Sequence, residues 1–413
     1  MVSKCSAFFL VLNILGVCFF SGCTISDRVT ENDKNSELSI TGFAFNTTYT
    51  INLYEGGNKD ILNQCVSMCA EYETIFSRTL KGSELYNINE IESYYIDYVK
   101  KSEIISGMWS NVLGSQEENE EINGNGSRSG RKTRVKYTPR QIIDIDDEIN
   151  RQLNIKNDVK YKLNKNGTMQ FELSDDFTEL LERGIYYSKL AEGSFDITIA
   201  PVSSLWDFTA DAPQVPQESS INDALKCVGY ENMTLDGKVL TLKIPGMGID
   251  LGGIAKGFIA DKLKEYLVDS GVKSGTISLG GNVLCIGKKP DGSPFRIGVQ
   301  QPFAERNEII TAVGADDVSV VSSGVYERYF EYGDTIYHHI LNPKTGYSYD
   351  NGLVAVTIVS DESIDGDGLS TTCFALGEKK GMKLVNSIDG VEAVFITDDE
   401  KLHYSDGFKK LEN

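Results

Sequence analysis

Residues 248–257 of this chain read Gly248-Ile249-Asp250-Leu251-Gly252-Gly253-Ile254-Ala255-Lys256-Gly257. The pattern predicts a strand that ends at Asp250, a turn through two glycines, and a helix whose first turn contains Lys256. Such a turn exposes backbone N–H groups beside a cation, which suits a pyrophosphate. The spacing of the Walker loop is absent. Paired glycines in a strand-to-helix turn also serve close packing, so this segment alone leaves phosphate binding and packing equally open.

A second polar segment, Asp365-Gly366-Asp367-Gly368-Leu369-Ser370-Thr371-Thr372, follows later in the chain. If a helix begins near Asp365, then Asp367 and Thr371 stand at positions i and i+4 and present two oxygens on one face. Hard oxygen ligands of this kind suit Mg²⁺, which also accepts substrate phosphates as ligands. The alternative is that one of the aspartates is a helix N-cap and Thr371 is simply exposed.

Two of the three histidines, His338 and His339, are adjacent near the end of a predicted strand. Neighbouring strand residues point to opposite faces, so at most one of them can face a given pocket. A metal site with two histidines is therefore disfavoured. One histidine could act as a general base near neutral pH, although a structural role is the commoner one for a single strand histidine.

Hydrophobic periodicity predicts helices and strands along the rest of the chain. Alternating apolar residues predict a strand from Gly42 to Tyr54, and helical spacing predicts a helix from about Lys59 to Phe76. Ser174-Asp175 is the N-cap signal of a helix that reaches Lys189. We expect further strands at 239–244, 275–279, 295–299, 318–322, 335–340, 353–359 and 393–397, and helices at about 254–269, 366–376 and 378–388. Because there is no repeat and no second composition regime, we predict one large α+β domain with mixed sheets and flanking helices.

The N-terminus indicates export. An apolar run from Ala7 to Phe20 is short for a membrane-spanning helix, and Phe20-Ser21-Gly22-Cys23 is close to a bacterial lipobox. We expect a lipoprotein signal peptide over 1–22, acylation (palmitate) at Cys23 and a tether over 23–40. A plain cleaved signal or an uncleaved anchor is the alternative. The mature chain would be lipid-anchored at the extracytoplasmic face of the bacterial cytoplasmic membrane.

The folded domain is expected to span 41–413, with a low-complexity insertion at about 115–136. The insertion combines glutamates with a run rich in Gly, Ser and Arg and has no apolar face, so we predict a solvated loop. A basic contact for anionic lipid or wall polymer is the alternative.

Composition excludes one class of partner. With 60 acidic and 40 basic residues the formal net charge is −20, which would repel a nucleic-acid backbone. Any anionic ligand must therefore be held by a metal ion, a helix N-terminus or a few placed cations. Of the 8 cysteines, those left after the leader and Cys23 are expected to be free or buried thiols; they are Cys65, Cys69, Cys227, Cys285 and Cys373.

Taken in order, these segments resemble the ApbE family, the flavin transferases that move FMN from FAD onto a threonine of a partner protein. The resemblance runs from about Gly42 to about Thr397. Each motif alone is loose, but six in register are specific. Beyond the segments already quoted, it rests on Phe76-Ser77-Arg78, Ser83-Glu84-Leu85, Ile88-Asn89, Ala191-Glu192-Gly193-Ser194-Phe195-Asp196-Ile197-Thr198 with Pro201 and Trp206, Ser278-Leu279-Gly280-Gly281-Asn282, Ser322-Ser323-Gly324 with Tyr326, and Pro343 with Thr345-Gly346.

The chain departs from the family pattern at a few positions. Phe45 stands for the methionine that touches flavin. Asn342 and Ser348 replace the usual Asp and Pro of the histidine segment. Glycines at 366 and 368 replace alanines beside the metal aspartate, which leaves helix stiffness there less assured.

The resemblance implies roles for individual residues. The FAD site would lie between two lobes and use Phe45, Ser194, Phe195, Asp196, Asp250, Lys256 and Ile340. The metal would be Mg²⁺, held by the Gly253 carbonyl, Asp367 and Thr371. The implied catalytic residues are Lys256, Asp367 and His339, with His339 the candidate acceptor of the hydroxyl proton and His338 second.

The implied reaction is Mg²⁺-dependent attack of a threonine hydroxyl on the FMN-side phosphorus of FAD, with AMP leaving. The acceptor would be an extracytoplasmic redox or electron-transfer subunit. One alternative is an FAD pyrophosphatase that releases FMN and AMP, and another is a lipid-anchored flavin-binding protein without turnover. Asp367 and Thr371 argue against storage, which needs no metal. The resemblance implies an acceptor motif of Asp-Gly followed by a Ser/Thr-rich stretch that ends in Ala-Thr. Asp367-Gly368-Leu369-Ser370-Thr371-Thr372 is superficially similar to it, but Cys373 stands where the acceptor threonine would have to be, so we expect no self-modification.

Overall fold

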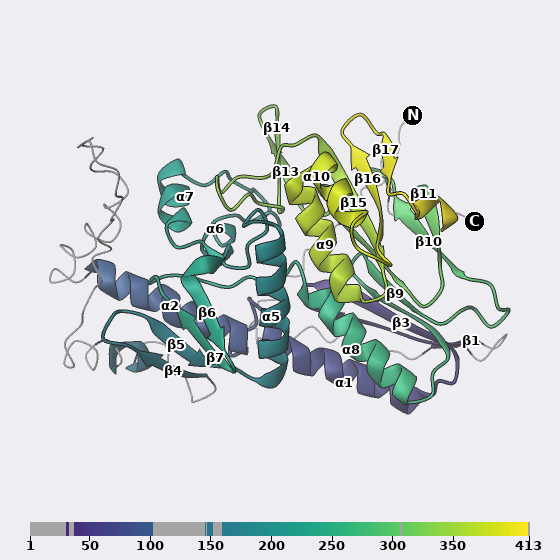
Figure 1. Ribbon diagram of the computed structural model, residues 1–413. Helices are drawn as coiled ribbons and strands as arrows, with labels where there is room; N and C mark the ends of the chain where they lie inside the picture. The colour runs from purple at the N-terminus through teal and green to yellow at the C-terminus, as the bar shows by residue number, and fades with distance from the viewer. Residues whose placement is uncertain are drawn as a thin grey trace, which may run out of the picture.

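The computed structural model describes residues 30–32, 37–101, 145, 147–151, 159–305 and 308–411. The predicted signal peptide, Cys23 and the insertion at 115–136 lie outside these residues. In the described part, a large sheet with its helices stands beside a smaller lobe, and helix α5 (Asp175–Leu190) runs between them (Figure 1).

The large sheet brings strands from both ends of the chain together. Its nine strands are all paired antiparallel with their neighbours. In spatial order they are β1 (Thr30–Asn32), β2 (Glu37–Ala44), β3 (Thr47–Glu55), β8 (Ser274–Leu279), β9 (Asn282–Ile286), β12 (Ser319–Gly324), β15 (Leu353–Ser360), β16 (Glu392–Thr397) and β17 (Leu402–Tyr404).

Both faces of this sheet are covered near β15, which explains why that strand is apolar almost without interruption. On one face Val356 and Ile358 pack into the main core beneath the helices. On the other face Ala355 and Val359 pack under the two-stranded sheet of β10 (Phe295–Gln300) and β11 (Ile309–Ala315). The alternation of side chains along one strand thus joins two separate cores.

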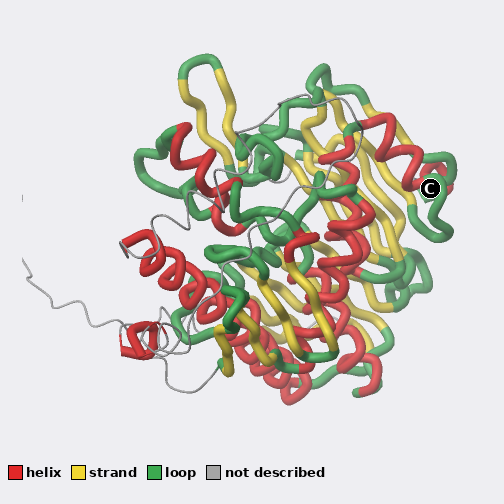
Figure 2. Tube along the Cα trace, turned by 60° about the vertical axis from the view of Figure 1, so that its left-hand side comes forward, coloured by secondary structure: helices red, strands yellow, loops and turns green. Residues whose placement is uncertain are grey.

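The helices of the large lobe are α1 (Lys59–Phe76), α8 (Ala255–Asp269), α9 (Ser363–Leu376) and α10 (Glu378–Val385). Helices α8 and α9 pack against each other and onto the same face of the sheet (Figures 1 and 2). They approach very closely at Gly257, where a Cβ atom would lie 2.4 Å from the Ser363 carbonyl oxygen. In the same way, side chains at 366 and 368 would meet Val321 and Tyr187, so the glycines there permit tight packing of α9.

The smaller lobe contains α2 (Glu84–Lys101), α6 (Ala200–Ser203), α7 (Glu218–Leu225) and an antiparallel sheet. The order of that sheet is β4 (Lys160–Leu163), β5 (Met169–Glu172), β7 (Val239–Leu242) and β6 (Met233–Asp236). A separate hairpin of β13 (Tyr329–Tyr332) and β14 (Thr335–His338) projects from the body of the protein (Figures 1 and 2). Short 3-10 turns complete the described elements at Tyr230–Asn232 and Phe408–Lys410.

The α+β prediction is confirmed, and the predicted helices and later strands agree with the structure to within a few residues. One detail is wrong: every ladder between described strands is antiparallel, so the sheets are not mixed.

Two expectations about the N-terminal part also need correction. The stretch from Gly42 to Tyr54 is a hairpin, because Phe45 and Asn46 have φ values of 55° and 57° and form a two-residue turn between β2 and β3. The fold also begins before residue 41, since β2 starts at Glu37 and β1 pairs with it. Part of the predicted tether therefore belongs to the sheet.

Two smaller points concern the whole described chain. No helix in the residues that the structure covers has the length and apolar character needed to cross a membrane. The prediction of free thiols is confirmed, since all five described cysteines are buried and unbridged.

We predict that Gly257→Ala lowers the free energy of unfolding by about 1–3 kcal/mol, because the added methyl group would press on the backbone of α9. Val268→Ala is the matched control on α8, where the side chain is 47% exposed, and should change stability by less than about 0.5 kcal/mol. Urea denaturation of both variants makes the comparison. Equal stabilities for the two would show that the α8–α9 contact is looser than described.

Candidate active site

A cleft of about 870 Å³ lies between the lobes and is lined from both sides. A second hollow, between α5 and α8, contains none of the predicted site residues. All of the predicted site residues within the described chain line the first cleft; they are Phe45, Ser194, Phe195, Asp196, Asp250, Gly253, Lys256, His339, Ile340, Asp367 and Thr371.

One wall of the cleft is the junction of α8 and α9, where each helix caps the other. The N-cap residues of both helices, Ile254 and Glu362, make no side-chain cap. Instead Asp367 on α9 accepts a hydrogen bond of 2.6 Å from the Gly257 N–H in the first turn of α8. In return Asp261 on α8 accepts the first two N–H groups of α9, at 2.7 and 2.8 Å. The exchange satisfies donors that each helix would otherwise leave unpaired.

The glycine turn and α9 meet at the point where a metal site would need them. A Cβ atom on Gly253 would lie 3.8 Å from Thr371 Oγ1, so the glycine turn and the second turn of α9 are neighbours. Gly253 precedes Ile254, the N-cap residue of α8, so its carbonyl lies outside the hydrogen-bond ladder of the helix, while the Gly257 N–H is donated to Asp367. The helix therefore does not need the Gly253 carbonyl, which can serve another ligand.

Asp367 is almost fully buried and its charge is only partly compensated by the chain. Burial raises its pKa, although Lys256, the Asn282 amide (3.1 Å) and the Gly257 N–H act in the opposite direction. A cation would supply the missing counter-charge. Within the described residues no group of three His, Cys, Asp or Glu side chains surrounds a possible metal. The donors present are one carboxylate, a hydroxyl and a carbonyl, and this hard oxygen set fits Mg²⁺.

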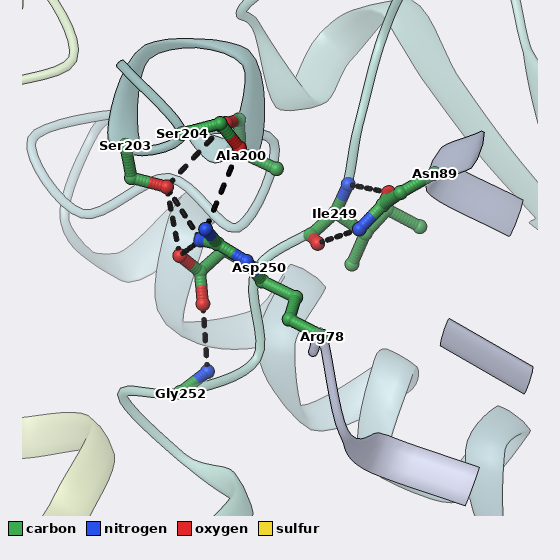
Figure 3. Close-up of polar contacts among 8 residues, drawn as sticks. All are labelled: Arg78, Asn89, Ala200, Ser203, Ser204, Ile249, Asp250 and Gly252. Carbon is green, nitrogen blue, oxygen red and sulfur yellow. Dashed lines mark hydrogen bonds and ion pairs between the residues drawn. The ribbon is translucent and has the colours of Figure 1, made fainter. Parts of the chain in front are cut away.

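Asp250 is held by an ion pair with Arg78, which arrives from the loop after α1 (Figure 3). Ser203 donates to the same carboxylate oxygen at 2.9 Å, and the Gly252 N–H donates to the other at 3.0 Å. Burial would raise the pKa of Asp250, but Arg78 and these two donors outweigh it and the pKa lies below its ordinary value.

Asn89 holds the same segment one residue earlier (Figure 3). Its side-chain amide accepts from the Ile249 N–H at 2.7 Å and donates to the Ile249 carbonyl at 2.8 Å. These two hydrogen bonds reproduce the pairing between neighbouring β-strands. The side chains of Asn89 and Arg78, both from the α1–α2 region, thus hold residues 249 and 250 in place.

The prediction for Asp196 needs refinement. Its side chain lies in the wall of the cleft, but its carboxylate already accepts three hydrogen bonds. They come from the Thr198 N–H (2.8 Å), the Thr198 hydroxyl (2.6 Å) and the Tyr230 N–H (2.9 Å). Asp196 therefore holds the loops behind the cleft together.

Beside Asp196, the Ser194 carbonyl accepts a hydrogen bond from the Tyr349 hydroxyl at 2.7 Å. The Phe195 ring lies against Gly253, where a Cβ atom would come within 3.0 Å.

Phe45 reaches the cleft at the tip of the β2–β3 hairpin. Its N–H is donated to Glu73 Oε1 on α1 at 3.1 Å, which holds the turn in place. The Arg328 side chain donates to the Asn46 carbonyl at 3.2 Å and joins the turn to the chain that precedes β13. Phe45 is therefore presented on a supported turn instead of within a strand.

The two histidines have different surroundings, as the strand pattern predicted. His338 is buried, with Nε2 2.9 Å from the Tyr349 carbonyl, while its Nδ1 accepts the Ile340 N–H at 3.3 Å. His339 lines the cleft and its Nδ1 lies 3.3 Å from the Arg328 carbonyl. Since a carbonyl can only accept, Nδ1 of His339 carries the proton and Nε2 offers a free lone pair.

Several residues that build the site were given no role from the sequence, namely Arg78, Asn89, Ser203, Asn282, Ser323 and Tyr349. Arg78, Asn89, Asn282 and Ser323 belong to motifs that supported the family resemblance. No spacing rule connects Arg78 with Asp250, because the two are joined only by the fold. For the four residues in motifs, the sequence signal was the polar residue itself, and nothing in the motif indicated which distant residue it would contact.

A sequence profile described as the ApbE family matches residues 130–395, which is more than half of the chain. The chain therefore belongs to the ApbE family, and the resemblance found in the sequence is confirmed.

Among similar proteins, the FAD:protein FMN transferase of Klebsiella pneumoniae is 37% identical over 212 residues, covering 51% of this chain and 65% of that relative. The FAD:protein FMN transferase of Vibrio cholerae is 28% identical over 316 residues, covering 72% of this chain and 95% of the relative.

Solved structures agree on the fold. The flavin transferase ApbE from Vibrio cholerae aligns with a TM-score of 0.65 at 22% identity, and the ApbE protein of Thermotoga maritima with 0.67 at 24%. Each alignment covers 91% of this chain and 99% of the other. The chain therefore has a single ApbE-like α+β fold.

We predict that Arg78→Ala lowers the free energy of unfolding by about 1–3 kcal/mol at pH 7, because it leaves Asp250 without its counter-charge. A carboxylate with a lowered pKa contributes stability above its unfolded pKa and loses it as pH falls through the folded pKa. The difference from the unchanged protein should therefore shrink toward about pH 3.5.

The control for this prediction is Lys160→Ala, which breaks an exposed ion pair with Glu172 and should cost under about 1 kcal/mol. Urea titrations at both pH values provide the measurement. If Arg78→Ala lowered the free energy of unfolding by the same amount at both pH values, its effect would be due to lost packing and not to the ion pair.

Proposed function

We propose that this chain is an FAD:protein FMN transferase, which moves FMN from FAD to a threonine hydroxyl of a partner protein and releases AMP. Membership of the ApbE family and the names of the curated relatives support flavin transfer. The observation that carries the proposal is the meeting of Asp367, Thr371, the Gly253 turn and Lys256 on one wall of a cleft.

The residues of the cleft suit the two halves of a dinucleotide. Phe45 and Phe195 offer apolar faces beside polar backbone, which suits a flavin ring. Asp250 is already neutralised by Arg78, so it is suited to accept hydrogen bonds from neutral groups of the nucleotide. Lys256 in the first turn of α8 lies where a pyrophosphate would meet both a cation and a helix N-terminus.

Asp367, Thr371 and the Gly253 carbonyl would hold Mg²⁺. When bound, the ion would neutralise charge on the pyrophosphate during phosphoryl transfer. The chain otherwise carries a net charge of −20, so the ion and Lys256 together would make the wall attractive to an anion.

His339 is the residue of this wall that is suited to accept a proton. The atoms that crowd around it in the cleft, together with the positive charges of His338, Arg328 and Lys256, lower the pKa of His339, while its side chain stays open to the cleft. The imidazole is therefore neutral at pH 7 and its Nε2 can take the proton of an incoming hydroxyl. The hydroxyl oxygen would form the new bond to the FMN phosphorus, and the bond from that phosphorus to the AMP oxygen would break.

Hydrolysis of FAD to FMN and AMP uses the same residues, with water in the place of the hydroxyl. Transfer is favoured here because the curated relatives are named for transfer to protein. We further propose that acylated Cys23 anchors the protein at the extracytoplasmic face of the membrane, where the acceptor would be a redox or electron-transfer subunit. The lipobox-like sequence supports that placement.

We predict that Asp367→Asn lowers FMN transfer by about 100-fold or more, since a neutral amide holds the cation much more weakly than a carboxylate. The measurement is the mass gain of one FMN on an acceptor domain incubated with FAD, Mg²⁺ and the full-length chain. Chelation of Mg²⁺ should abolish transfer by the unchanged chain.

Asp365→Asn is the matched control for Asp367→Asn, because Asp365 lies on the same helix but pairs with Arg183 and Tyr187 away from the cleft. Its folded fraction should transfer FMN at nearly the normal rate. Full transfer by Asp367→Asn would refute the proposed function of this wall.

We predict that His339→Gln lowers transfer by about 100-fold or more at neutral pH. Because the pKa of His339 is lowered, the base stays neutral as pH falls from 8 to 6, and kcat/KM should show no histidine inflection near pH 6.5. His338→Gln is the neighbouring control and should reduce thermal stability while the folded protein retains activity. Full transfer by His339→Gln would contradict the assignment of the base, whereas an inflection near 6.5 that the substitution removes would contradict the lowered pKa.

A further inference from the structure

We propose that aromatic side chains at the mouth of the cleft, most of them exposed, form the docking surface for the folded acceptor protein. These side chains, here called the aromatic rim, are Phe303, Tyr326 and Tyr329, with Phe43 on the β2–β3 hairpin. The inference rests on the proposed function and adds to it where the second substrate is recognised. Its partner is a folded protein that carries the acceptor threonine on an accessible segment and presents apolar side chains beside it.

Phe303 contacts the rings of Tyr326 and Tyr329, and Phe303, Tyr329 and Phe43 are exposed while Tyr326 is half-buried. Phe303 lies edge-on to Tyr329, with ring centroids 5.3 Å apart, and 6.1 Å from Tyr326. Phe303 is 48% exposed, Tyr329 37% and Phe43 55%. Clustered, partly exposed aromatic rings of this kind are enriched at protein–protein interfaces and supply much of their binding energy.

The backbone at Phe303 adds an independent observation. Phe303 has φ = 58° in the connection between β10 and β11, a conformation that a bulky residue rarely adopts. Neither this strain nor an exposed ring stabilises the fold. Strain of this kind is concentrated at binding and catalytic sites, which agrees with a role for Phe303 in contacting a partner.

The aromatic rim continues directly into the cleft. Phe43 lines the cleft, as do Glu327 and Arg328, which lie between Tyr326 and Tyr329 in the chain. The Arg328 carbonyl also accepts the His339 N–H at 3.1 Å. A protein seated on the rim would therefore lie next to the residue proposed to accept the hydroxyl proton.

The charges around the rim favour a protein over a membrane as the occupant. Exposed carboxylates flank it at Glu305, Glu308, Glu327 and Glu331. These would be repelled by anionic lipid headgroups, whereas a protein can present apolar and basic groups among them. Tyr332 and Ile336 on the projecting hairpin are also exposed and extend the apolar surface outward, beyond the reach of a small substrate in the cleft.

The experiment compares two FMN acceptors with the full-length chain. One is a folded acceptor domain that carries an Asp-Gly, Ser/Thr-rich sequence ending in Ala-Thr, and the other is a short peptide of that sequence alone. The variant is Phe303→Ser combined with Tyr329→Ser. Tyr186→Ser is the matched control, because Tyr186 is a 50% exposed aromatic residue on α5 that does not line the cleft.

We expect the double variant to lower kcat/KM for the folded domain by about 10-fold or more, through KM, since two anchoring rings are removed. For the peptide, kcat/KM should stay within about two-fold of the value for the unchanged chain, and so should the affinity for FAD. The melting temperature should stay within a few degrees. Tyr186→Ser should behave like the unchanged chain with both acceptors.

Unaltered transfer to the folded domain, or an equal loss with domain and peptide, would overturn the inference. If the double variant kept full transfer but lost self-association, the rim would bind a second copy of the chain. If it kept full transfer but lost binding to anionic vesicles, the rim would bind lipid. Either result would overturn the inference. If the unchanged chain transfers FMN to neither acceptor, the proposed function itself fails and the docking inference fails with it.

Discussion

The hydrogen bond from the Gly257 N–H to Asp367 connects the two halves of the candidate site, and most of the geometry of the cleft follows from it. It brings α8 and α9 close enough that only hydrogen fits at position 257. It also orients the carboxylate that the metal would need. Asp261 completes the exchange by capping α9, so neither helix can shift without exposing unpaired backbone donors.

A second constraint acts on the opposite side of the glycine turn. Arg78 and Asn89 clamp residues 249 and 250 from the α1–α2 region, so the segment that enters α8 is held on both sides. The turn is consequently placed by contacts from several parts of the chain. This rigidity suits a reaction that is catalysed mainly by positioning and charge neutralisation.

His338 is the last residue of β14 and His339 follows the strand, and their separate surroundings divide a structural role from a chemical one. His338 points inward and bonds the Tyr349 carbonyl, so it supports the wall of the cleft. His339 points to the cleft and keeps one ring nitrogen free. The aromatic rim lies just beyond, which places the proposed partner surface and the proposed proton acceptor on one continuous face.

The sequence by itself determined the elements with strong periodicity, such as α1 and α5, and the residue types of the site. It also indicated the ApbE family, because motifs in register are local properties of the chain. It could not predict the hairpin turn at Phe45, since the alternation of apolar residues continues through it. Helix α2 was not among the predicted helices, although Leu85, Ile88 and Ile91 recur at helical spacing and pack into the main core. Only the tertiary structure decided that Arg78 pairs with Asp250, that Asp196 is occupied by its own loops, and that glycines at 257, 366 and 368 are required by packing. These depend on contacts between segments far apart in the chain, and local patterns carry no information about which distant atoms will meet.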